Sequence, residues 1–119
     1  MDRLIKAWQN SVRAFWKLLH TEAAFQQEMG LLAVAVPAAW FFSSSWRGYA
    51  LLVGAILLLI MVEVLNTGIE AACDAVSREF HIDIQLAKDC GSLAVLISVV
   101  LAAIVWGLAV VETFTGLPL

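Results

Sequence analysis

Residues 49–74 read YALLVGAILLLIMVEVLNTGIEAACD, an apolar run that continues into polar side chains spaced at intervals of three, four and four. These side chains are Glu63, Asn66, Glu70 and Asp74, and at about 100° per residue they share one face of a helix. A carboxylate at membrane depth costs about 2.5 kcal/mol or more, so it is retained where it faces partner helices, water or a ligand. This polar stripe is therefore the first candidate for a functional site.

The composition of the chain is that of a membrane protein. Hydrophobic residues make up 62% of its 119 residues, well above the roughly half expected of a soluble domain. The net charge is only −3, and no basic patch indicates nucleic-acid binding. No apolar signal region follows the basic N-terminal stretch, so we expect the mature chain to start at Met1 and to form a single domain over 1–119.

Four helices are expected, which makes the protein all-α. Residues 2–20 place apolar groups on an arc of about 120° with basic groups opposite, the pattern of an amphipathic helix on the membrane surface. Three transmembrane helices follow at about 23–43, 46–79 and 86–113. The second is longer than the hydrocarbon core of about 30 Å, so its last turns must enter water. Three short helices bury little surface around a polar stripe, and we therefore expect oligomerisation.

Basic residues in the loops indicate the orientation. Four precede the first span, Arg47 alone lies between the first and second, and Arg78 and Lys88 lie between the second and third. The N-terminus is thus expected in the cytoplasm and the C-terminus outside. The outer boundary would carry three aromatic side chains typical of the interface: Trp40, Trp46 and Tyr49.

The polar stripe joins apolar depth to the cytoplasmic boundary. Counted from the outer boundary, Glu63 lies about 21 Å into the membrane, and Glu70 about 10 Å further. A lipid head-group and a water-borne nucleotide or metal ion meet only at that boundary. Glu22 and Glu28 flank the first span at a similar depth and could converge with Glu70 on a hard divalent cation. Glu63, which is less hydrated, could act as a general base.

Lys88 beside Asp89 offers a cation for phosphate and a carboxylate to orient it. A charged turn between membrane helices is, however, commonly a solvated cap. Asn66 and Glu70 could likewise be interhelical hydrogen-bonding groups, with Gly68 as a close-packing residue. No motif of a soluble nucleotide-binding fold, such as GxxxxGK[ST] or GxGxxG, occurs in the sequence.

Several segments together resemble the signature of the prokaryotic diacylglycerol kinase family, which are integral membrane lipid kinases. They are EVLNTGIEA at 63–71 with Asp74, EAAF at 22–25 with Glu28, and EFH at 79–81 with AKD at 87–89 and Gly91-Ser92. Their order and spacing also look like those of the family, from Arg3 to about Trp106.

The resemblance implies a homotrimer in the bacterial cytoplasmic membrane, with active sites at subunit boundaries near the cytoplasmic surface. It implies transfer of the γ-phosphoryl group of ATP to the hydroxyl of diacylglycerol, which gives phosphatidic acid, with Mg²⁺ as cofactor. Glu63 matches the family's general base, and Glu22 and Glu70 match its metal ligands. The positions that match ATP contacts are Arg3, Asn10, Glu22, Glu70, Glu79, Phe80, His81, Lys88 and Asp89. Those that match the lipid site are Arg3, Glu28, Glu63, Asn66 and Ser92.

Two alternatives stay open. A related branch of the same family phosphorylates undecaprenol. A small proton-coupled transporter, in which Glu63 binds a proton or a cationic substrate in turn, belongs to a different class. The transporter leaves Glu22, Glu70 and Lys88 unexplained, and an odd number of spans fits poorly with paired inverted repeats.

Overall fold

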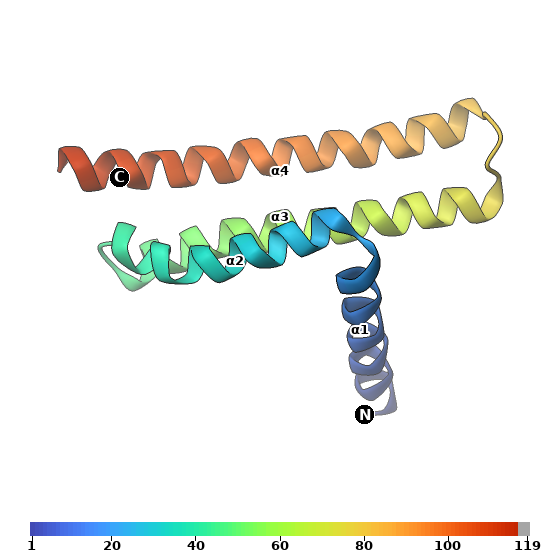
Figure 1. Cartoon of the computed structure of the whole chain (residues 1–119), viewed down its shortest axis with the longest axis horizontal. Coiled ribbons are helices and arrows are strands. Elements are labelled where there is room, and N and C mark those ends of the chain that lie inside the picture. The colour runs from blue at the N-terminus through green and yellow to red at the C-terminus, as the bar shows by residue number, and fades with distance from the viewer. Residues whose placement is uncertain (117–119) are drawn as a thin grey trace.

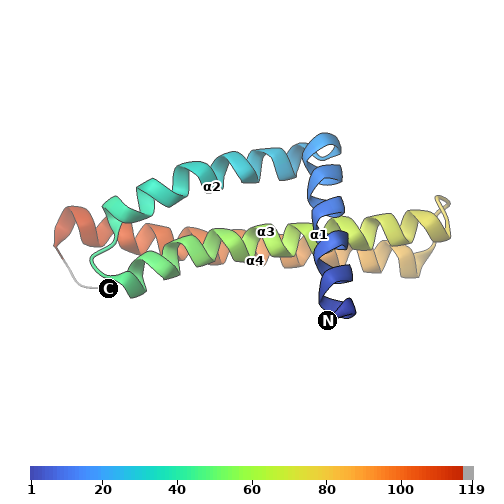
Figure 2. The same cartoon turned by 90° about the horizontal axis from the view of Figure 1, so that it is seen from below.

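The computed structural model describes residues 1–116 and is helical throughout that range apart from its short connections, as the sequence predicts. Its helices are α1 (Asp2–Thr21), α2 (Ala23–Phe42), α3 (Trp46–Val76) and α4 (Ile82–Thr115). Helix α3 runs antiparallel to both α2 and α4 (Figure 1). Helix α1 leaves this bundle at a steep angle, as both Figure 1 and Figure 2 show.

Two helix ends differ from the sequence-based expectation. Helix α3 ends at Val76 rather than near residue 79, because Ser77 adopts an extended backbone and its hydroxyl accepts a hydrogen bond from the Glu79 amide at 3.1 Å. Helix α4 begins at Ile82 rather than near residue 86, with Asp83 in its first turn, where an acidic side chain is favourable. The loop between α3 and α4 therefore consists of residues 77–81 alone.

Among the described residues, α3 and α4 are long and apolar enough to cross a membrane. At 1.5 Å per residue they are about 46 and 51 Å long, which exceeds a hydrocarbon core of about 30 Å. Helix α2 is not in this group, because Gln26, Gln27 and Glu28 occupy its second turn. They leave it an apolar run of only about 14 residues, too short to span alone. The third expected span therefore stays a prediction.

Apolar side chains fill the bundle where α2, α3 and α4 lie together, which we call the three-helix region. One buried cluster near the α2–α3 turn contains Ala39, Leu52 and Ala109, and a second, nearer α1, contains Phe25, Ala35, Ile56 and Ile60. Trp106 packs against both clusters, and its indole Nε1 donates a hydrogen bond to the Leu52 carbonyl at 3.0 Å. This region is thus a dry core shared by three helices.

Beyond the start of α2, only α3 and α4 continue side by side (Figure 2). Leu18 and Val64 both pack against the second apolar cluster, so the junction of α1 and α2 lies level with Val64. Past that level is the two-helix region, residues 65–92. Its buried members among the described residues are Asn66 and Gly91, and no apolar cluster forms there.

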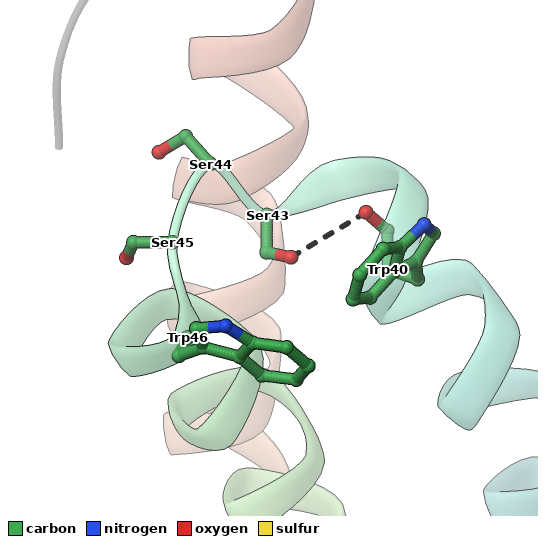
Figure 3. A pocket seen from close by; sticks show the side chains of 5 residues that line it. All are labelled: Trp40, Ser43, Ser44, Ser45 and Trp46. Carbon is green, nitrogen blue, oxygen red and sulfur yellow. Dashed lines mark hydrogen bonds between the residues drawn. The ribbon is translucent and has the colours of Figure 1, made fainter.

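The α2–α3 turn at the opposite end of the bundle carries a pocket of its own. Its volume is about 380 Å³, and its lining consists of Trp40, Ser43, Ser44, Ser45 and Trp46 (Figure 3). The rings of Trp40, Trp46 and Tyr49 contact one another edge to face, with centroids 5.4, 6.1 and 6.1 Å apart. The three aromatic side chains assigned to the outer boundary therefore form one cluster, far along the bundle from the 77–81 loop (Figure 1).

Candidate functional site

The polar stripe forms as predicted, because α3 is continuous and its four members therefore share one face. Two members of the stripe contact α4. Asn66 lies against Gly91 of α4, and Asp74 Oδ1 accepts a hydrogen bond from Lys88 Nζ at 2.9 Å. The other two members, Glu63 and Glu70, lie near the glutamates at the start of α2.

Glu22 and Glu70, the two predicted metal ligands, line the same pocket. It has a volume of about 390 Å³, and the other residues that line it are Thr67, Ala71, Asp74, Ala75 and Arg78. Mg²⁺ is usually bound through one or two carboxylates and keeps waters and phosphate oxygens as its remaining ligands. Two carboxylates in an open pocket fit that requirement.

Glu28, which the sequence suggested could join Glu22 and Glu70 on a divalent cation, does not line this pocket. Its Oε1 atom is buried. Within residues 1–116, no group of three or more His, Cys, Asp or Glu side chains is arranged to hold a metal ion. The carboxylates of Glu22 and Glu70 are thus a partial ligand set rather than a complete cage.

Negative charge gathers around Glu63. Glu70 and Glu22 both repel its carboxylate, and Glu63 in turn repels Glu28. The ion pairs found in the described residues involve Asp74 and none of these four glutamates. The Glu28 Oε1 atom is buried without a hydrogen-bond partner. A cluster of carboxylates therefore lies where α3 passes the α1–α2 junction, and it would favour a cation beside it.

Five of the residues predicted to contact ATP line a second pocket, of about 240 Å³, at the 77–81 loop. They are Glu79, Phe80, His81, Lys88 and Asp89. Arg78 lines both this pocket and the pocket shared by Glu22 and Glu70, which we call the carboxylate pocket. Asp74 connects the two pockets, since it binds Lys88 and its Oδ2 lies 3.9 Å from Arg78 Nη1. The hydrogen-bonded partner of Lys88 is thus Asp74 on the facing helix rather than its sequence neighbour Asp89.

Six predicted contact residues line neither pocket within one chain: Arg3, Asn10, Glu28, Glu63, Asn66 and Ser92. Arg3 and Asn10 belong to α1, which packs against α2 alone among the helices and points away from the α3–α4 pair (Figure 1). Asn10 Oδ1 accepts a hydrogen bond from Arg13 Nη2 at 3.0 Å. Ser92 is exposed on α4 and lines neither pocket.

Two residues of this region, Arg78 and Gly91, were not assigned a role in the site from the sequence. Arg78 follows Asp74 by four residues, so the periodicity that defines the polar stripe could have found it. Gly91 could not be found in this way, because its contact is with another helix. A Cβ at Gly91 would collide with Asn66 Oδ1, whereas a Cβ at Gly68 would meet nothing within 4 Å. Close packing of α3 on α4 therefore depends on Gly91 rather than on Gly68.

Comparison with known proteins places this geometry in a family. The family model described as prokaryotic diacylglycerol kinase matches residues 9–110, which include the polar stripe and both pockets. Diacylglycerol kinase of Escherichia coli strain K12 is 39% identical over 108 residues, covering 87% of this chain and 85% of that protein. Diacylglycerol kinase of Pseudomonas aeruginosa is 35% identical over 106 residues, covering 89% and 86% respectively. The chain belongs to the prokaryotic diacylglycerol kinase family.

Proposed function

We propose that this protein is a lipid kinase that transfers the γ-phosphoryl group of ATP to the hydroxyl of diacylglycerol, giving phosphatidic acid. The observation that carries the proposal is the juxtaposition of Glu63 with Glu22 and Glu70, where the apolar three-helix region meets the polar two-helix region. Relatives at 39% and 35% identity are named diacylglycerol kinase, which supports a lipid alcohol as the acceptor.

Helix α1 supports the placement of this site at the membrane boundary. Its apolar side chains are exposed, with Leu4 at 69% and Trp8 at 71%, as expected for a helix whose apolar face is buried among lipids. It leaves the bundle at a steep angle (Figure 1), and its junction with α2 lies level with Val64. With α1 on the membrane surface, Glu63 lies just inside the apolar layer and Glu70 on its water side. A lipid hydroxyl and a nucleotide can meet at that level.

In this mechanism, Glu63 takes the proton of the lipid hydroxyl as its oxygen attacks the γ-phosphorus of ATP, and the bond from that phosphorus to the bridging oxygen of ADP breaks. Glu22 and Glu70 would hold Mg²⁺, which would neutralise charge on the phosphate groups. Lys88, oriented by Asp74, places a further cation beside the phosphates. Phe80 and His81 line the pocket on the ATP side.

We further propose three spans and a homotrimer with composite sites in the bacterial cytoplasmic membrane, the N-terminus in the cytoplasm and the C-terminus outside. Arg78 and Lys88 in the two-helix region support that orientation. An apolar groove of about 300 Å³ between α2 and α4, lined in part by Leu31, Ile56 and Val99, supports a neighbouring copy on this face. A neighbour's α1 would supply Arg3 and Asn10, which one chain holds away from its own pockets.

The test is phosphate transfer by the purified protein in mixed micelles. Labelled γ-phosphate of ATP is offered with Mg²⁺ to diacylglycerol and, in parallel, to undecaprenol. We expect labelled phosphatidic acid to form at the higher rate. Preferred labelling of undecaprenol would assign the protein to that branch of the family. No transfer to either lipid by folded protein would contradict the kinase, and substrate-dependent proton flux in liposomes without ATP would then favour the transporter.

A further inference from the structure

Asn66 is a strongly buried polar side chain within the two-helix region, with 8% of its surface exposed. Its Nδ2 donates a hydrogen bond to Glu70 Oε1 at 3.4 Å. Its Oδ1 is buried and has no hydrogen-bond partner. A buried carbonyl oxygen without a partner is unfavourable. The side chain therefore depends on its packing, rather than on hydrogen bonds at both ends, to stay in this orientation.

That packing comes from Gly91 of α4. The backbone of Gly91 is buried against the Asn66 amide, and a Cβ built at this position would collide with Oδ1. The hydrogen that glycine carries in place of a Cβ points toward Oδ1, in the manner of a weak Cα–H···O contact. The reversed amide would set Oδ1 against the Glu70 carboxylate, and two acceptors cannot bond to each other. Gly91 and Glu70 together thus fix which end of the amide faces each of them.

Glu70 needs such support because it is itself exposed on α3. A free glutamate side chain samples several rotamers, and a hydrogen bond from a fixed neighbour selects one of them. Groups that orient a metal ligand in this way are often needed nearly as much as the ligand. The chain of contacts runs from α4 through Gly91 to Asn66, then to Glu70 and the pocket shared with Glu22.

We propose that Gly91 is a positioning residue for the kinase reaction. By admitting the Asn66 amide into the α3–α4 contact, it holds Nδ2 on Glu70 and so holds the Glu70 carboxylate in the pocket opposite Glu22. Asn66 thereby acts through Glu70 rather than on the lipid. The kinetic consequence rests on the proposed function, whereas the contact itself can be tested without it.

The contact is tested by NMR on protein labelled with ¹⁵N at asparagine. The chain has two asparagines, Asn10 and Asn66, so the exposed Asn10 serves as an internal reference. Gly91→Ala is expected to shift the side-chain amide signals of Asn66 and to leave those of Asn10 in place. The matched control is Gly107→Ala, also on α4, where a Cβ would meet nothing within 4 Å. Asn66 signals that stay in place in Gly91→Ala would overturn the proposal.

The kinetic test uses the same variants. Gly91→Ala is expected to lower kcat about 10- to 100-fold with little change in the KM for lipid, as is typical when the support of a metal ligand is lost. Placed on top of Asn66→Ala, the same glycine substitution should cost almost nothing more, because it acts through the amide that is already gone. Losses that multiply in full in the double variant would overturn the proposal.

Folding is checked by helix content and thermal unfolding of each variant. If Gly91→Ala fails to fold, the double variant Asn66→Ala/Gly91→Ala is expected to fold, because the colliding amide has been removed. Failure of both would contradict the contact. An inactive parent chain would instead refute the proposed function, and the Asn66 signals would still decide whether Gly91 orients the amide.

Discussion

The three-helix and two-helix regions are built on the same two long helices, yet they bury opposite kinds of residue. In the three-helix region, Leu52 and Ile56 are only 2% and 5% exposed. In the two-helix region, the buried residues are Asn66 and Gly91. The difference is α2, which covers one part of the pair and not the other (Figure 2). A third helix makes a dry core, and its absence leaves the polar stripe open to ligands.

Among the substitutions that test this difference between the two regions, Glu70→Gln is expected to have the largest effect on activity. The substitution keeps the size of the side chain but removes one charge from the carboxylate pocket. We expect kcat to fall at least about 100-fold, the scale seen when one group that stabilises developing charge is lost, and more Mg²⁺ to be needed. The measurement is phosphate transfer against Mg²⁺ concentration.

The matched control for that change is Glu112→Gln, near the C-terminal end of α4. It removes the same charge from the opposite end of the bundle and should keep the parent rate. A parent-like rate in Glu70→Gln, or equal losses in both variants, would mean that the two-helix region is not the catalytic end.

Substitutions in the ion pair between the two pockets, Asp74 with Lys88, are expected to have an intermediate effect on activity. Lys88→Ala removes a cation from the pocket at the 77–81 loop, where we propose that ATP binds, and the KM for ATP should rise about tenfold. Asp74→Asn only loosens that cation. The side chains are 40% and 35% exposed, so solvent screens the pair and the KM should rise by less. An ATP titration of both variants ranks them, and the reverse order would contradict the assigned roles.

The smallest effect on activity is expected in the three-helix region. Leu52→Ala should lower the free energy of unfolding by about 2–4 kcal/mol, because Leu52 is buried in the apolar core. The kcat of the folded protein should stay within about twofold, or 0.4 kcal/mol. Leu51→Ala, at a neighbouring position that is 55% exposed, is the control for unfolding in denaturant. A tenfold loss of kcat in folded Leu52→Ala would show that the two regions are not separable.

The sequence predicted those features that one helix determines by itself. The polar stripe is an example, since the intervals between Glu63, Asn66, Glu70 and Asp74 place them on one face of any helix. The all-α fold and the start of α3 at Trp46 follow from the same local patterns.

Contacts between helices could not be predicted from the sequence. The pairing of Asp74 with Lys88, and of Asn66 with Gly91, depends on how α3 and α4 are aligned on either side of the 77–81 loop. The sequence placed this loop too late, because the helical pattern continues through Arg78 while Ser77 ends the helix with its own hydrogen bond. A shift of a few residues there changes every contact across the pair.

The central claim is that Glu63 is the base of a phosphoryl transfer to lipid, and Glu63→Gln tests it most directly. ATP binding and transfer of labelled phosphate to diacylglycerol are measured on the same preparation, beside the parent chain. The account predicts parent-like helix content and ATP affinity, with transfer reduced about 10²- to 10⁴-fold, the usual contribution of a general base. Transfer at the parent rate by folded Glu63→Gln would contradict it.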